Sequence, residues 1–300
     1  MNYLLELTIT GISRGSIYAL LALGYTMVYG IIGMINFAHG EIYMLSAFVA
    51  LVSASILQIL GFGKLFIFIG TLLIAITYGC AYGLTVERMA YKPLRNSPRL
   101  TCLISAIGMS IFLQNYVLLG YGSEIQPFPA LIPEFAFLEP VSTYLLNTDF
   151  VIIVATLLAT GLLLLFTRYS KMGMAMRAVS QDQTMAMLLG IDINRIIAAT
   201  FVIGSGLAAI AAVLIGSHMR QINYFIGFTV GIKAFTAAVL GGIGNITGAV
   251  VGGYILGIVE SYAAGYISSS YKDVFAFSLL VLILIFRPAG LLGVQTTEKV

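Results

Sequence analysis

The stretch GYTMVYGIIGMINFAHGE, residues 24–41, is typical of a membrane-spanning helix that ends in polar groups before the next apolar run begins at Ile42. Its glycines weaken a continuous helix, and Asn36, His39 and Glu41 supply hydrogen-bonding groups at the end. Two interpretations fit this pattern. Either a broken helix lines a polar cavity at membrane depth, or the polar groups lie among lipid headgroups at the membrane edge. Periodicity does not separate them.

The composition places the rest of the chain in the same setting. Of the 300 residues, 60% are hydrophobic and 9% are charged, against roughly 25% charged in a soluble domain. Apolar stretches of roughly 20 residues, the length that crosses a bilayer, recur from end to end. We therefore expect an all-α, polytopic transmembrane helical bundle of about eight to nine spans, with broken helices and a cytoplasmic coupling helix, forming a single domain over residues 1–300. The expected spans are 16–36, 42–61, 66–86, 101–121, 149–167, 196–216, 225–243, 246–264 and 273–287.

The charged residues between the spans predict the orientation. Two inter-span stretches are basic, one with Arg88, Lys92, Arg95 and Arg99 and another with Arg168, Lys171, Arg177 and Arg195. The stretch 122–149 carries only acidic charges. Because Lys and Arg accumulate in cytoplasmic loops, the basic stretches and the tail after Arg287 should be cytoplasmic and 122–149 external. The apolar segment from Tyr3 to Ser13 crosses only part of a bilayer alone, so the side of the N-terminus stays open.

The sequence lacks the motifs for zinc binding and for ATP binding, and its charge does not indicate nucleic acid binding. The two histidines, His39 and His218, form no zinc motif, so we expect no metal and no cofactor. The insertion bias of Lys and Arg explains the net charge of +3, so we expect no nucleic acid partner. GGIGNITG, residues 241–248, lacks the GK[ST] of a phosphate-binding loop, which predicts that the chain is not an enzyme that binds ATP. We interpret the glycines of this stretch as a tight break between two membrane helices; they are Gly241, Gly242, Gly244 and Gly248.

Isolated polar side chains inside the expected spans are candidates for a translocation path. Gln114 and Asn115 fall near the middle of one span, where an amide needs a helix, water or ligand partner. Lys233 and Glu260 flank the glycine break in two neighbouring spans. Ionisable groups at such depth usually face a bundle interior or an aqueous cavity. For Lys233 and Glu260, a mutual salt bridge and a role in the path are equally good interpretations.

Four long motifs closely resemble the LivH-type permease subunit of bacterial branched-chain amino acid ABC importers. They are LALGYTMVYGIIGMINFAHGE (21–41), SAIGMSIFLQNY (105–116), LLGIDINRIIAATFVIG (188–204) and GIKAFTAAVLGGIGNITGAVVGG (231–253). The resemblance implies a bacterial inner-membrane protein that transports leucine, isoleucine or valine. It also implies a LivM-type second permease, two ATP-binding subunits, a periplasmic or lipid-anchored substrate-binding protein and surrounding membrane lipid.

The same resemblance implies a short cytoplasmic helix that couples the permease to its ATPase. RAVSQDQTMAMLLGIDINR, residues 177–195, matches that segment, and Ser180 is our candidate N-cap for it. The alternative is an amphipathic linker on the membrane surface that has no partner. The residues assigned to coupling are Ala178, Ser180, Asp182, Met185, Ala186, Leu188, Leu189, Gly190 and Ile191.

Three classes of function fit these features of the sequence. The first is the ABC importer permease, for branched-chain amino acids or, in a close variant, for urea or short amides. The second is an ion-driven secondary transporter, which Lys233 and Glu260 favour. The third is an intramembrane enzyme that uses His39 and Glu41.

Overall fold

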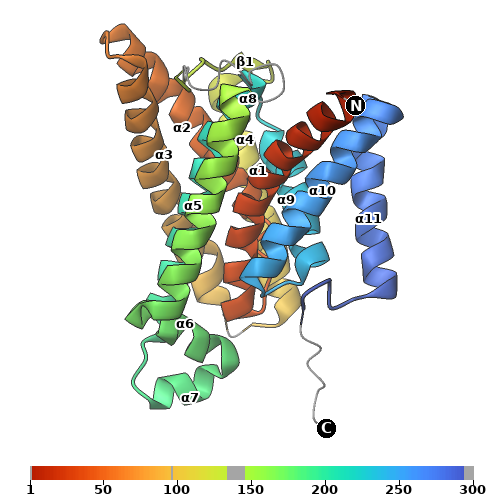
Figure 1. Ribbon diagram of the computed structural model, residues 1–300. Coiled ribbons are helices and arrows are strands. Elements are labelled where there is room, and N and C mark those ends of the chain that lie inside the picture. The colour runs from red at the N-terminus through yellow and green to blue at the C-terminus, as the bar shows by residue number, and fades with distance from the viewer. Residues whose placement is uncertain (1, 96, 134–145, 294–300) are drawn as a thin grey trace.

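The computed structural model describes residues 2–95, 97–133 and 146–293 and shows a bundle of α-helices (Figure 1). Within these ranges, eight helices are long and apolar enough to cross a membrane, and a ninth apolar helix, α9, is shorter. This confirms the all-α polytopic fold with about eight to nine spans. The helices of the bundle are α1 (Asn2–Ile32), α2 (His39–Ile59), α3 (Lys64–Val86), α4 (Arg99–Tyr121), α5 (Asn147–Tyr169), α8 (Ile193–Met219), α9 (Ile226–Gly241), α10 (Ile246–Tyr266) and α11 (Lys272–Phe286).

Short elements connect these helices at the two ends of the bundle. At one end lie a π-helical turn, a 3-10 turn and two small helices: η1 (Glu87–Tyr91), η2 (Lys92–Leu94), α6 (Lys171–Gln181) and α7 (Gln183–Leu188). At the other end lie two strands and a 3-10 turn: β1 (Gln126–Pro127), β2 (Gln221–Ile222) and η4 (Ser269–Tyr271). The strands pair antiparallel, with Gln126 opposite Ile222.

Helix α1 runs through the centre of the bundle and corrects the expected boundaries of the first span. Residues 3–13 and 16–32 form one helix instead of a short apolar segment followed by a span. In the polar interruption between them, Ser13 and Ser16 are buried and Gly15 lies against α10. A Cβ on Gly15 would lie 2.8 Å from Cα of Tyr254, so only glycine allows this approach of the two backbones.

The two basic stretches lie at the same end of the molecule, as the charge pattern predicts (Figure 1). Arg95, after η2, donates to the Oδ1 atom of Asn194 at 2.6 Å and pairs with Glu87, so the two stretches are in direct contact. We call this end of the bundle the inner end. The start of α1 and the β1–β2 pair lie at the opposite end, which we call the outer end.

The last described residues return to the inner end. The backbone N–H groups of Leu291 and Leu292 donate to the carbonyls of Leu240 and Gly241, at the turn between α9 and α10. The chain up to Gly293 therefore stays beside the inner ends of α9 and α10. The expected cytoplasmic C-terminus itself lies outside the described residues.

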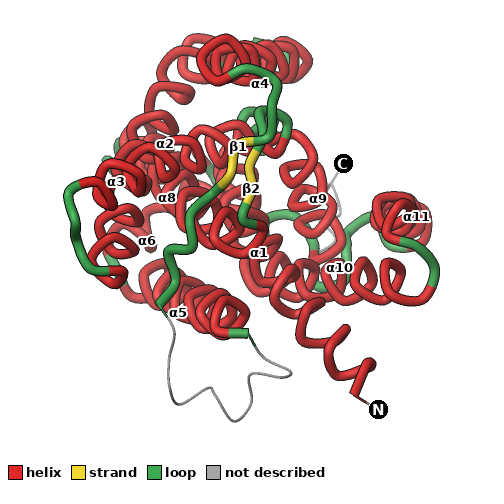
Figure 2. Tube along the Cα trace, turned by 90° about the horizontal axis from the view of Figure 1, so that it is seen from above, coloured by secondary structure: helices red, strands yellow, loops and turns green. Residues whose placement is uncertain are grey.

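Helices α2 and α9 both begin inside the bundle. His39, the first residue of α2, packs against Gly24 of α1, eight residues or ~12 Å before α1 ends. Helix α9 has 16 residues and is ~24 Å long, short of the ~30 Å hydrocarbon layer. The view from above shows α1 and α8 in the middle and α4, α5 and α11 at the periphery (Figure 2). The bundle therefore contains two helices, α2 and α9, whose N-termini lie inside it.

Candidate translocation and coupling sites

Asn36 holds the loop between α1 and α2 in place. Its Oδ1 atom accepts hydrogen bonds from the backbone N–H of Ala38 at 3.1 Å and from the hydroxyl of Tyr91 at 3.0 Å. Tyr91 belongs to η1, and its ring packs on Phe201 of α8 at 5.2 Å between centroids. The side chain of Asn36 is buried, with its Nδ2 atom unpaired among the described residues. In this conformation Asn36 is enclosed by protein and organises the start of α2.

His39 is packed inside the bundle. It is 1% exposed, and its ring lies edge-on to that of Tyr25, 4.8 Å away between centroids. A Cβ on Gly24 would overlap the Nε2 atom of His39, so the imidazole fills the space that the glycine leaves. The Nε2 atom has no hydrogen-bond partner within the described ranges. His39 is therefore a buried polar group that is positioned by its packing against Gly24 and Tyr25.

Glu41 lies where three helices meet. It is 1% exposed, and its Oε1 atom accepts a hydrogen bond from Ser110 of α4 at 3.1 Å. Its Oε2 atom has no hydrogen-bond partner in the described part of the chain and points at Gly227, in the first turn of α9. Glu41 also belongs to the first turn of α2. Two helix N-termini thus face this carboxylate, and their partial positive charges favour a negative group there.

The N-terminal turns of α2 and α9 touch through glycines. A Cβ on Gly40 would overlap the carbonyl oxygen of Gly227 and would lie 3.0 Å from Cα of Gly231. No side chain fits in this contact. We call residues 39–41 of α2, together with the Gly227–Gly231 face of α9, the α2–α9 junction. Its polar groups lie in the packed interior, so a path through them requires the junction to open.

Gln114 and Asn115 take different positions on α4. The Asn115 side chain is exposed and donates back to the carbonyl of Ile111 in its own helix at 2.8 Å. Gln114 is half-buried, and its Nε2 atom has no partner among the described residues. The two amides are adjacent in sequence and therefore point to different sides of the helix. Among the described residues, no hydrogen bond joins either amide to the α2–α9 junction.

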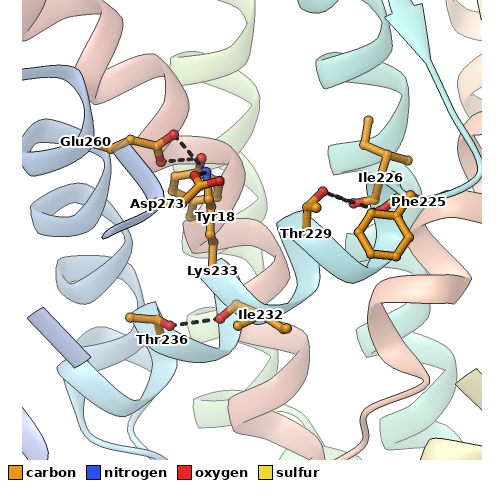
Figure 3. Close-up of polar contacts among 9 residues, drawn as sticks. All are labelled: Tyr18, Phe225, Ile226, Thr229, Ile232, Lys233, Thr236, Glu260 and Asp273. Carbon is orange, nitrogen blue, oxygen red and sulfur yellow. Dashed lines mark hydrogen bonds and ion pairs between the residues drawn. The ribbon is translucent and has the colours of Figure 1, made fainter. Parts of the chain in front are cut away.

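Lys233 and Glu260 do form a salt bridge, and two further residues that sequence reasoning missed join it (Figure 3). The Nζ atom of Lys233 lies 2.9 Å from Oε1 of Glu260 and 2.6 Å from Oδ1 of Asp273. The hydroxyl of Tyr18 donates to Oε2 of Glu260 at 2.6 Å. We call these four residues, from α9, α10, α11 and α1, the charge network. Asp273 offered a sequence signal, being an acid at the start of an expected span; Tyr18 offered none.

The glycine-rich stretch forms the turn between α9 and α10. Gly242 and Gly244 have φ of +105° and +96°, which favours glycine at both positions. Asn245 caps α10 by accepting from the backbone N–H of Gly248 at 3.1 Å. Gly241 and Gly248 pack against each other, since a Cβ on Gly241 would overlap the carbonyl oxygen of Gly248.

The candidate coupling segment is two helices that meet at Asp182. The Oδ1 atom of Asp182 accepts from the backbone N–H groups of Thr184 and Met185, so Asp182 is the N-cap of α7. The expected N-cap, Ser180, is wrong because this residue is still inside α6 and its hydroxyl donates back to the carbonyl of Arg177. Gly190, with φ of +82°, follows the end of α7.

Helix α7 presents an apolar surface without a partner in the described part of this chain. Leu188 is 77% exposed and Leu189 is 79% exposed, and Met185 beside them is also exposed. Ala186 is buried, while Ala178 and Ile191 are partly buried and pack against the core. We call Met185, Leu188 and Leu189 the α7 surface.

A hydrogen bond attaches α7 to the core of the bundle. The Nε2 atom of Gln183 donates to the carbonyl of Ile31, at the end of α1, at 2.9 Å. This bond joins α7 to the end of α1, just before the loop that carries Asn36.

The fold belongs to a known class of membrane proteins. The chain is similar to an inward-facing structure of a putative metal-chelate type ABC transporter, with a TM-score of 0.51 and 15% identity over 93% of this chain and 86% of that one. At this identity the likeness concerns the fold alone. This chain therefore shares its overall fold with that transporter structure.

Sequence comparison narrows the class to a family. The family model described as the permease component of branched-chain amino acid transport systems matches residues 7–284. The chain is 51% identical to the high-affinity branched-chain amino acid transport system permease protein LivH of Escherichia coli strain K12, over 99% of this chain and 98% of that protein. It is 49% identical to the permease protein BraD of Pseudomonas aeruginosa, over 100% and 98%. The chain belongs to the branched-chain amino acid permease family.

Proposed function

We propose that this chain is the transmembrane permease subunit of an ABC importer that moves leucine, isoleucine and valine, driven by ATP hydrolysis in separate subunits. The observation that carries this proposal is the α7 surface, found at the inner end of a chain that belongs to the permease family. Exposed leucines next to a membrane bundle are more stable when buried in the groove of a cytoplasmic protein than when left in water. The Met side chain beside them suits an adaptable binding surface.

The proposed assembly follows from the same reasoning. The chain acts as one permease domain in a bacterial inner membrane, with the inner end and the C-terminus in the cytoplasm. It pairs with a LivM-type second permease, recruits two ATP-binding subunits at its inner end and receives substrate at its outer end from a periplasmic or lipid-anchored binding protein. The chain itself carries out no catalysis and holds no metal or cofactor.

We propose that the translocation path uses the polar groups described above. Asn36, His39 and Glu41 lie at the α2–α9 junction or the loop before it, Gln114 and Asn115 on α4, and Lys233 and Glu260 in the charge network. The turn at Gly241, Gly242, Gly244 and Gly248 lies at the inner end, where α9 and α10 reach the side of the ATPase. Opening the α2–α9 junction would expose His39 and Glu41 to a passing substrate.

Replacing Leu188 and Leu189 together by Glu tests the coupling role of α7. Burial of an apolar surface contributes about 25 cal/mol per Å², and an introduced carboxylate must in addition be desolvated. We expect normal insertion of the variant and normal pairing with the second permease, but loss of ATPase co-purification or of ATP-driven leucine uptake in proteoliposomes. If both remain at wild-type levels, residues 178–191 are not the coupling segment, and the contact must be sought in the other basic loop, near Arg88 to Arg99.

A matched control separates loss of the α7 surface from added charge at the inner end. Met172 and Met174 of α6 are also exposed, so Met172→Glu with Met174→Glu adds the same two charges outside α7. We expect this variant to retain the ATPase. A second control is nucleotide binding by the purified chain alone, which we expect to be absent because the sequence has no phosphate-binding loop.

The uptake assay also decides between the alternative functions. Uptake of urea or short amides in place of leucine would assign the chain to a related ABC importer. Uptake that depends on an ion gradient, without ATP, would assign it to the ion-driven transporters that the buried charges first suggested.

A further inference from the structure

A cavity opens beside the charge network at the outer end of the bundle. It has a volume of about 230 Å³, which is below the roughly 300–1,000 Å³ of sites for drug-sized ligands and suits a smaller molecule. Helices α1, α9, α10 and α11 contribute its charged lining, and the β1–β2 region closes one side. We call it the outer cavity.

Arg14 brings an uncompensated positive charge to this cavity. It lies one helical turn before Tyr18 on α1, and its Nε atom is buried without a hydrogen-bond partner among the described residues. Within the described ranges, the structure gives its guanidinium no ion pair, whereas the ammonium of Lys233 is paired with both Glu260 and Asp273. A guanidinium next to a cavity matches a carboxylate in geometry and charge, because it offers parallel N–H donors.

An anionic group also lines the cavity. Asp273, at the start of α11, turns Oδ1 toward Lys233, and its side chain is 50% exposed. A carboxylate has about four lone-pair sites, so one contact with Lys233 leaves Asp273 able to accept from a further ammonium group. Glu260 is buried and accepts from both Lys233 and Tyr18, so it is already engaged.

Part of the remaining wall is apolar and branched, and Gln221, Asn223, Thr229 and Lys272 add polar groups to the lining. Ile222 comes from β2, and Ile226 and Val230 come from the first turns of α9. Ile125, next to β1, completes this side. Branched side chains of this size form a surface on which an aliphatic group of similar shape can be buried.

We propose that the outer cavity binds a free aliphatic α-amino acid as it enters the transporter. Its carboxylate pairs with Arg14, its ammonium with Asp273, and its side chain packs on Ile222, Ile226 and Val230. This proposal deepens the proposed function and rests on it. It names a substrate contact on this chain that is separate from the α2–α9 junction.

Three probes test the site on the purified full-length chain in lipid nanodiscs, with no other protein present. Leucine carries both charges, leucinol lacks the carboxylate, and 4-methylpentanoate lacks the ammonium. We expect the wild type to bind leucine more tightly than either analogue. Arg14→Gln should weaken leucine binding roughly ten- to a hundredfold, the factor for a lost charge-assisted hydrogen bond, and should abolish the preference over leucinol. Asp273→Asn should abolish the preference over 4-methylpentanoate.

Control variants separate binding from folding. Arg14→Lys keeps the charge and should restore part of the affinity. Arg220→Gln removes an exposed cation at the same end, outside the cavity, and should leave leucine affinity unchanged. Thermal unfolding of every variant in nanodiscs checks that the bundle is intact. Equal affinity of the wild type for leucine and leucinol would overturn the proposed site.

Uptake by the complete reconstituted transporter makes the two proposals separable. If the wild type takes up leucine with ATP while Arg14→Gln does so at the same rate and affinity, the outer cavity is not a substrate site and the proposed function stands. If the wild type fails to take up leucine, the proposed function fails first. If the isolated chain binds no leucine and Arg14→Gln weakens only docking of the substrate-binding protein, the carboxylate comes from that protein, and the inference is wrong.

Discussion

The charge network and the α2–α9 junction both hold buried ionisable groups, yet they are stabilised in different ways. In the charge network, Lys233 and Glu260 pair with each other. Lys233 also pairs with Asp273, and Glu260 also accepts a hydrogen bond from Tyr18. At the junction, Glu41 has a hydrogen bond from Ser110 on one oxygen only, and His39 has an Nε2 atom without a partner among the described residues. Ion pairs stabilise the charge network, and close packing of glycines stabilises the α2–α9 junction. The two should therefore respond in opposite ways when charge or shape is altered.

Removing the cation of the charge network should have the largest effect. Lys233→Met leaves Glu260, which is 2% exposed, with only the Tyr18 hydroxyl as a partner among the described residues. Breaking a buried pair by removing one partner typically costs about 3–5 kcal/mol, because an uncompensated charge stays buried. We expect a strongly lowered midpoint of thermal unfolding in nanodiscs.

A double variant checks that charge is the cause. Adding Glu260→Gln to Lys233→Met removes the stranded carboxylate and should recover most of the lost stability. Equal destabilisation of the single and double variants would mean that Lys233 acts through packing, and the contrast with the junction would disappear.

A methyl group in the α2–α9 junction should have the next largest effect. Gly40→Ala places a Cβ against the carbonyl of Gly227, and overpacking of this kind costs roughly 1–3 kcal/mol. We expect a lower unfolding midpoint and reduced leucine uptake. Gly108→Ala in α4 is the control, since its Cβ meets open space and should leave stability unchanged or slightly raised.

Neutralising Glu41 should change stability much less. Glu41→Gln keeps an oxygen that can accept from Ser110 and removes a buried charge with no ion pair among the described residues, so we expect a change of no more than about 1 kcal/mol. Uptake should nevertheless fall if Glu41 belongs to the path, as we propose. A loss of stability as large as that of Lys233→Met would show that the helix N-termini around Glu41 act as a full counter-charge.

The smallest effect on folding is expected at Asn115. Its side chain is exposed and bonds back to its own helix, so Asn115→Leu should alter stability by no more than about 0.5 kcal/mol. We expect leucine uptake to fall while the complex still assembles, because Asn115 is proposed to line the path. Unchanged uptake rates would assign Asn115 to the lipid-facing or packing surface of α4.

The sequence predicted the elements of this fold better than their contacts. Apolar stretches and basic clusters indicated the helices and the inner end, because both depend on local composition. The sequence predicted that the second span begins at Ile42, but α2 begins at His39. That start depends on how His39 fits against Gly24 in another helix. Ser180 was misplaced as a cap because the choice between it and Asp182 depends on where α6 ends.

By itself, the sequence determined the membrane setting, the helical class and the family, since these depend on hydropathy and on long motifs. It also marked Lys233 and Glu260 as unusual, because a charge in an apolar stretch is visible without any structure. Only the tertiary structure decided that they are partners of Tyr18 and Asp273, that Glu41 lies between two helix N-termini, and that Arg14 lines a cavity without an ion pair among the described residues. Desolvation of a group depends on its neighbours in space, and these come from helices far apart in the chain.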